Sequence, residues 1–195
     1  MKHINKSVLF LIILSIASWG RLLFLEGLWG DDWAWVWQYF GTDSYREFIY
    51  PWQSVGHTLD GSLIYTNLCL LDYFKENTTW ILNIIRFFMF TINGLIIFFI
   101  FKKLMRYNTI LPETIGAIYL VSPIVNILWI LQMNRTLFLL AYLLSVLLTV
   151  IILNKDKFQW FYYVCSIILM TFAIFGLESF IFIEMLRPII IYYLS

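Results

Sequence analysis

The hydrophobic and polar positions of the chain form long apolar runs that short polar segments separate. Runs of about twenty apolar residues have the length that an α-helix needs to cross a bilayer. We predict six such spans, at about 7–25, 79–101, 110–131, 136–153, 158–177 and 180–195. The pattern therefore predicts an all-α fold, a polytopic transmembrane helix bundle.

One long polar interruption, at 26–78, differs from the rest because it carries most of the acidic residues. Within it, 32–40 predicts a short amphipathic helix in the membrane interface, and 62–74 an apolar piece too short to cross. Pro51 predicts a turn at 50–52, and the Asp-Gly pair predicts a turn at 59–62. We therefore predict an outer loop with interfacial helices, within a single membrane domain at 1–195.

The composition agrees with a protein that lies mostly in lipid. Hydrophobic residues make up 62% and charged residues 13% of the 195 residues, and the mean hydropathy is +0.82. A soluble domain is far less apolar than this. The net charge of +1 gives no reason to expect a nucleic-acid partner. Cys69 and Cys165 lack metal-ligand or disulfide-motif spacing and are interpreted as packing residues.

Basic residues predict the orientation of the spans. If the N-terminus is cytoplasmic, most of the basic residues near span ends fall on the inside, as the positive-inside rule requires. These residues are Lys2, Lys6, Lys102, Lys103, Arg106, Lys155 and Lys157. We expect an integral, multi-pass protein of a bacterial plasma membrane. A cleaved signal peptide ending near Ala17 is the alternative for the first run, but apolar residues resume beyond Arg21, which favours an uncleaved span.

Asp31 and Asp32 are the main candidates for chemistry, because they follow the first span directly and lie among tryptophans. One carboxylate of such a pair can act as a general base, or the two can bind a divalent cation such as Mg or Mn. The alternative is an ordinary pair of solvated loop acids. The surrounding aromatic residues have two interpretations as well, a membrane-interface belt and a surface that stacks on sugar rings.

Three further residues are predicted at the same membrane level as the acid pair. Arg86 and Arg135 would neutralise the acids or bind a phosphate, and Glu178 would face the same aqueous surface. His57 and Asp60 lie in the same outer loop and carry less weight. Glu184 and Arg187 have the spacing of an intrahelical ion pair, and Glu113 that of an acid at a helix N-terminus.

The first third of the chain resembles the GT-C superfamily of membrane glycosyltransferases. The resemblance rests on a first span followed at once by Gly30-Asp31-Asp32-Trp33, then by interfacial helices and closely spaced spans. It implies a polyprenyl-phosphate-linked sugar as donor and Asp31 or Asp32 as catalytic base or metal ligand, with Arg135 or Glu178 as further outer-face residues. Members of this superfamily are usually longer, so we expect a truncated or partial member.

The leading hypothesis is therefore a cell-envelope glycosyltransferase that moves a sugar from a polyprenyl-phosphate donor to an acceptor on the extracytoplasmic face. A transporter or flippase subunit is the second hypothesis, with Arg86, Glu113 and Glu184 along a path through the membrane. A non-catalytic membrane protein is the third. Lipid and a lipid-linked sugar are the expected partners.

Overall fold

The structure is a computed structural model of the chain that describes residues 2–24, 32–74, 78–105, 110–122, 133–154, 159–176 and 179–194. Every element in these ranges is helical, so the predicted all-α class is confirmed for them. The elements are α1 (Lys2–Trp19), the 3₁₀ helix η1 (Gly20–Phe24), α2 (Asp32–Phe40), α3 (Tyr45–Ser54), α4 (Thr58–Phe74), α5 (Thr78–Leu104), α6 (Leu111–Val121), α7 (Met133–Leu153), α8 (Trp160–Gly176), α9 (Ser179–Glu184) and α10 (Arg187–Leu194).

Three described helical segments are long and apolar enough to cross a membrane, namely Lys6–Phe24, Thr79–Leu104 and Asn134–Leu153. They coincide with the spans predicted at 7–25, 79–101 and 136–153. The helices α6 and α8 are apolar but shorter. The predicted span at 110–131 is therefore represented by a helix over its first half, and the remainder from 123 lies outside the described residues.

The predicted span at 180–195 is wrong as one continuous helix. The chain instead forms the two short helices α9 and α10, with a turn at Met185 and Leu186 between them. Pro188 supplies the physical reason. Its ring would collide with the carbonyl group of Glu184 in an unbroken helix, and it has no N–H to donate there. A helix therefore stops before this proline and a new one starts with the proline in its first turn.

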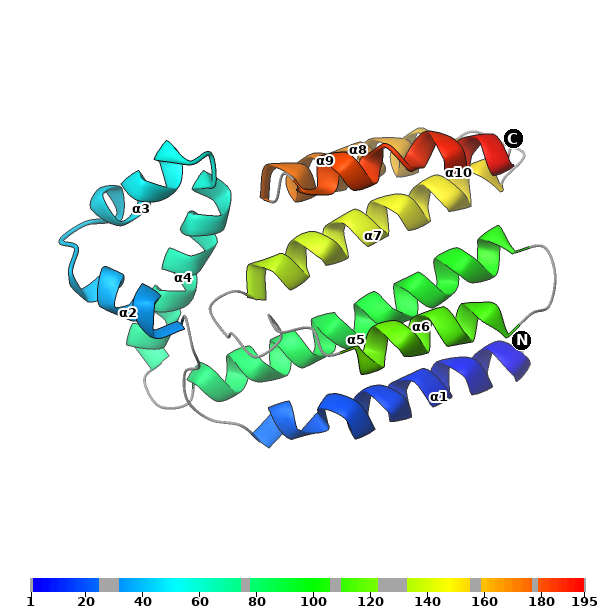
Figure 1. The fold of residues 1–195 in the computed structure, drawn as a ribbon, viewed down its shortest axis with the longest axis horizontal. Coiled ribbons are helices and arrows are strands. Elements are labelled where there is room, and N and C mark those ends of the chain that lie inside the picture. The colour runs from blue at the N-terminus through cyan, green and yellow to red at the C-terminus, as the bar shows by residue number, and fades with distance from the viewer. Residues whose placement is uncertain are drawn as a thin grey trace.

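The long helices pack side by side, with α7 between α5 and α8 and with α5 also against α6 (Figure 1). Two groups of buried apolar side chains hold the bundle together. One lies between α5, α7 and α8 around Phe138, and the other lies between α1, α5 and α6 around Phe98. Both phenylalanines have no exposed surface. The core of the bundle is therefore divided on the two sides of α5.

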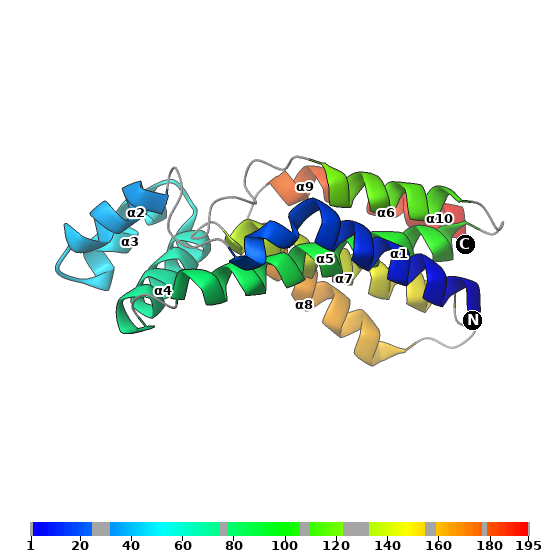
Figure 2. The same ribbon diagram turned by 90° about the horizontal axis from the view of Figure 1, so that it is seen from below.

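The helices α2, α3 and α4 form a separate group beyond one end of the bundle (Figures 1 and 2). Phe48, Ile64 and Leu68 make the buried centre of this group, and Trp35 and Trp52 pack against it with ring centroids 4.7 Å apart. The N-terminus and the end of α5 lie at the opposite end of the bundle (Figure 1). Helix α2 coincides with the helix predicted at 32–40, and α4 contains the apolar piece predicted at 62–74.

The two turns predicted inside this group are wrong. Pro51 lies inside α3, and Asp60 and Gly61 lie inside α4. The chain turns instead between the two helices at Gly56, whose φ of 82° suits a residue without a side chain. Ser44 is the N-cap of α3, and its side chain accepts a hydrogen bond from the Glu47 N–H at 3.4 Å. Local turn signals were thus overridden by the packing of two amphipathic helices.

Gly176, at the end of α8, lies where two helices pack closely, and a larger residue there should destabilise the fold. A Cβ atom there would lie 2.2 to 2.4 Å from the ring of Phe138, which is fully buried. We expect Gly176→Ala to lower the free energy of unfolding by about 1–3 kcal/mol, because the rigid ring has no room to move. Thermal unfolding in detergent measures this.

Gly116→Ala is the matched control for this prediction, since its Cβ would meet its nearest neighbours at 3.3 to 3.4 Å. There the gain in helix propensity offsets the tighter contact. Equal stability of the two variants would contradict the proposed close contact between α7 and α8.

Candidate functional site

Asp32 and Arg86 form the first group of candidate residues that the structure brings together. Asp32 is the first residue of α2 and Arg86 lies near the start of α5, and neither side chain has exposed surface. The charge of Asp32 acts directly on the Arg86 guanidinium. A carboxylate at a helix N-terminus is also favoured by the helix dipole. The pair therefore lies where α2 begins and near the start of α5, the longest candidate span.

Burial changes the role that this pair can play. Removing one partner of a buried ion pair leaves the other charge uncompensated, which costs about 3–5 kcal/mol. An acid held by a guanidinium and closed off from solvent is a weak proton acceptor for an incoming substrate. Burial therefore favours a structural role for Asp32 and Arg86, while the roles in catalysis and phosphate binding predicted from the sequence stay predictions.

A second polar group joins α4 to the start of α7. The Asn134 side-chain amide donates to Asp60 Oδ1 at 2.8 Å and to the Asp60 backbone carbonyl at 3.1 Å. Asn67 Nδ2 donates to Asn134 Oδ1 at 3.3 Å. All three side chains are buried. Asn134 is thus the residue through which the interfacial helices and the bundle share hydrogen bonds.

The electrostatic setting of Asp60 is that of a partly neutralised acid. Burial raises the pKa of Asp60 above its ordinary value of 3.8, and the hydrogen bond from Asn134 and the positive charges of Arg135 and His57 oppose this shift. Burial is the largest of these effects, so the folded chain binds a proton at Asp60 more tightly than the unfolded chain does. His57 and Asp60, which the sequence gave little weight, are therefore neighbours in one group.

Arg135 is the predicted substrate-binding residue with donor capacity to spare. It is half-buried at the start of α7, and its Nε is buried without a hydrogen bond to any described residue. A buried guanidinium N–H of this kind gains most from an oxygen acceptor such as a carboxylate or phosphate. At the end of the bundle that faces α2–α4, Arg135 therefore offers a hydrogen-bond donor and Asp60 offers an acid with a raised pKa.

Aromatic side chains border these groups on two faces of α2. Trp35 and Tyr39 pack inward against α3 and α4, while Trp33 and Trp37 are 53% and 76% exposed. Burial, together with neighbours such as Cys69, raises the pKa of Tyr39 to about 12. Tyr39 therefore stays a neutral phenol at physiological pH. Exposed tryptophans are typical of the membrane interface, which favours the belt interpretation for Trp33 and Trp37.

The described residues do not supply a metal site. They contain no group of three or more His, Cys, Asp or Glu side chains that could hold a metal ion. Asp32, the described member of the acid pair, faces a guanidinium. The Mg or Mn ion that the sequence allows at Asp31 and Asp32 stays a prediction. Cys69 and Cys165 are both free thiols, as predicted.

The five site residues predicted from the sequence do not all lie in one place. Asp32 lies with Arg86, and Arg135 lies with Asp60. Asp31 and Glu178 lie outside the described residues, and their assigned roles stay predictions. Asn134 was missed because an asparagine at the start of a span looks like part of a loop. Its signal is the polar amide placed directly before a long apolar helix.

The residues of the transporter hypothesis do not form one path. Arg86 lies at the α2 end of the bundle with Asp32. Glu113, which lies in the first turn of α6 as predicted, accepts a hydrogen bond from Ser7 Oγ at 2.8 Å. Glu184 pairs with Arg187, but across the turn between α9 and α10 and not within one helix as predicted. Each charge is thus engaged at a different helix contact.

Comparison with known proteins gave no match: no family model, no curated protein and no solved structure matches this chain.

The raised pKa of Asp60 makes a prediction about stability and pH. The Asp60 contribution to stability is complete below pH 3.8, the ordinary pKa, and is lost as the pH rises through the higher pKa of the folded chain. Asp60→Asn fixes the neutral form and keeps an acceptor for Asn134. We therefore expect this variant to gain stability relative to the wild type as the pH rises from about 4 to about 8.

The measurement is the difference in unfolding temperature between Asp60→Asn and wild type across that pH series. Asp72→Asn, at an exposed position of the same helix, is the control and should show a constant difference. If instead the wild type becomes more stable relative to Asp60→Asn as the pH rises, the charges of Arg135 and His57 affect the pKa of Asp60 more than its burial does.

Proposed function

We propose that this chain is a membrane glycosyltransferase of the GT-C type, which moves a sugar from a polyprenyl-phosphate donor to an acceptor on the extracytoplasmic face. One observation carries the proposal most directly. Asp32, the described member of the acid pair, is buried at the start of α2 and interacts electrostatically with Arg86. A buried acid that stabilises the start of α2 leaves the neighbouring acid in the sequence, Asp31, as the proposed reactive group at the membrane surface.

In the proposed reaction Asp31 is the general base. Its carboxylate accepts the proton of the acceptor hydroxyl while the hydroxyl oxygen bonds to the anomeric carbon of the sugar. The bond from that carbon to the phosphate oxygen breaks, and the polyprenyl phosphate leaves with the electron pair. Arg135, whose Nε has no hydrogen bond to a described residue, is proposed to bind the leaving phosphate. Asp32 and Arg86 position the loop, and Glu178 remains a candidate for acceptor binding.

The distribution of basic residues supports the proposed orientation. Lys102 and Lys103 occupy the last turn of α5, and Lys6 is exposed in the first turns of α1. Figure 1 places these chain ends together, opposite α2–α4. By the positive-inside rule the lysine end is cytoplasmic, so α2–α4 and the acid pair face the outside.

The test of the reaction is transfer of radiolabelled sugar from polyprenyl phosphate in membranes that carry equal amounts of each variant. We expect Asp31→Asn to lower the rate by about 10²- to 10⁴-fold, the usual contribution of a general base. Asp72→Asn is the control, as an exposed acid of the same loop. A full rate for Asp31→Asn would overturn its role as base, and no transfer by the wild type would overturn the proposed function.

Asp32 needs a separate design, because Asp32→Asn leaves Arg86 buried and uncompensated. We expect that variant to lose about 3–5 kcal/mol of stability. The double variant Asp32→Asn/Arg86→Met removes both charges and should recover most of this loss. Transfer by the stabilised double variant would confirm a positioning role, whereas a stable and inactive double variant would show that Asp32 itself takes part in the reaction.

Orientation is tested with cysteines placed at the two ends, in a chain whose Cys69 and Cys165 are replaced by serine. Val55→Cys lies in the exposed turn before α4, and Lys103→Cys lies in the exposed last turn of α5. We expect a membrane-impermeant maleimide added to intact cells to label Val55→Cys alone. Permeabilised cells are the control and should label both positions. The reverse pattern would contradict a cytoplasmic N-terminus.

A further inference from the structure

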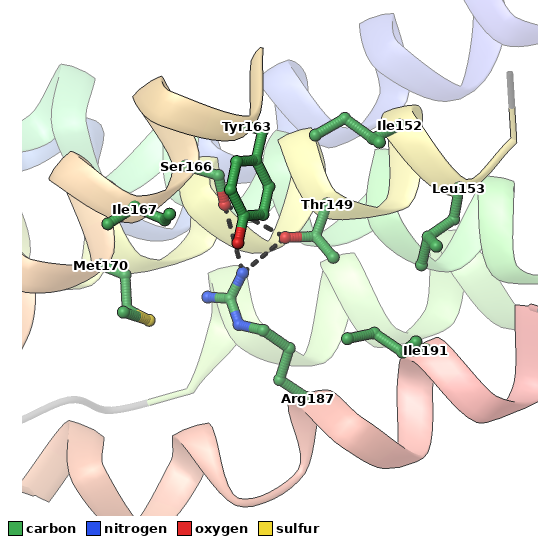
Figure 3. A pocket seen from close by; sticks show the side chains of 9 residues that line it. All are labelled: Thr149, Ile152, Leu153, Tyr163, Ser166, Ile167, Met170, Arg187 and Ile191. Carbon is green, nitrogen blue, oxygen red and sulfur yellow. Dashed lines mark hydrogen bonds between the residues drawn. The ribbon is translucent and has the colours of Figure 1, made fainter. Parts of the chain in front are cut away.

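A cavity of about 460 Å³ lies between α7, α8 and α10 (Figure 3). Its walls are mainly aliphatic, and the apolar lining comes from Ile152, Leu153, Ile167, Met170 and Ile191. Pockets of this size with apolar walls and a few convergent polar groups are typical of sites for small amphipathic ligands.

The polar part of this cavity is a guanidinium held among hydroxyl groups. Arg187 Nη1 donates to the side-chain oxygens of Thr149 and Ser166, the latter at 3.3 Å, and Nη2 donates to Ser145 Oγ at 2.9 Å. Figure 3 shows the guanidinium reaching from α10 toward α7 and α8, with one terminal nitrogen against the hydroxyls of Thr149 and Ser166. The donors are thus gathered at one place in an apolar cavity.

The position of Arg187 is fixed from both sides. Its Nε pairs with the Glu184 carboxylate across the turn before α10, and its side chain is only 11% exposed. Ser145 and Ser166 also hydrogen-bond to each other at 3.0 Å. A guanidinium donates and cannot accept, so a ligand at this position must offer oxygen acceptors. Glu184 already balances the positive charge of Arg187. The placement of the ligand's oxygen acceptors therefore matters more for binding than the ligand's net charge.

We infer that this cavity binds one acyl chain of a membrane phospholipid, with a phosphate oxygen accepting from Arg187. The wall formed by α7 belongs to a candidate span, so lipid is the apolar molecule available at this surface. Phosphate is the acceptor that phospholipids present, and guanidinium groups suit its geometry. The cavity lies along the last turns of α7, toward the lysine end of the bundle. It is therefore distinct from the Asp32 and Asp60 groups.

The experiment is native mass spectrometry of the full chain in detergent, titrated with phosphatidylglycerol or with diacylglycerol of the same acyl chains. We expect the wild type to retain phosphatidylglycerol about tenfold more tightly, the effect of about 1.4 kcal/mol from a charge-assisted hydrogen bond. Met170→Trp fills the cavity and should remove the binding of both lipids. Ile168→Trp on the same helix is the control, since Ile168 is 61% exposed and does not line the cavity.

Arg187→Gln tests the polar contact and should reduce phosphatidylglycerol binding to the level of diacylglycerol. Arg187→Lys is the second variant, for the case that Arg187→Gln does not fold. It should retain part of the preference for phosphatidylglycerol over diacylglycerol. Unchanged lipid binding in Met170→Trp would overturn the cavity as the site. Equal binding of the two lipids by the wild type, or an unchanged preference in both Arg187 variants, would overturn the phosphate contact.

Discussion

Buried polar side chains must find partners inside the protein, and this constraint decides how the helices of this chain meet. Asn134 supplies such partners between α4 and α7. Its side-chain N–H groups donate to the backbone carbonyl and Oδ1 of Asp60, and its Oδ1 accepts from Asn67. A lost partner at such a position costs about 1–3 kcal/mol, more than most apolar contacts at a helix end supply. The position of α2–α4 against the bundle therefore depends on hydrogen bonds, with the aromatic core of that group stabilising each helix locally.

The same constraint explains why charges lie close to opposite charges at three of the described helix junctions. Asp32 with Arg86 joins α2 to α5, Asp60 lies near Arg135 where α4 meets α7, and Glu184 pairs with Arg187 before α10. None of these pairs adds much stability compared with a well-packed apolar contact, because desolvation offsets the attraction. Their effect is on specificity, since a helix that shifts along its neighbour would leave a charge uncompensated.

The sequence predicted the parts of this fold that depend on length and composition. The three long apolar helices follow from apolar runs of sufficient length, and the contact between Glu184 and Arg187 follows from their spacing. Turn residues were less informative. Pro51 and Gly61 both lie inside helices, where Gly61 lets the Trp52 ring pack directly against α4. The polar group around Asn134 was not predictable. Asn134 lies 67 positions from Asn67 and 74 positions from Asp60 in the sequence, and no local pattern indicates contacts over such separations.

Asp60 and Arg135 show how one group can serve both stability and the proposed chemistry. An anion that binds Arg135 would compete with the Asp60 carboxylate for the same positive charge. Burial already raises the pKa of Asp60, so this acid can take up a proton at lower cost than a solvated one. Protonation would remove the competing charge while the acid keeps an oxygen for Asn134 to donate to. The contact between α4 and α7 could then persist while Arg135 turns its donors to a phosphate, which separates the binding of the ligand from the packing of the helices.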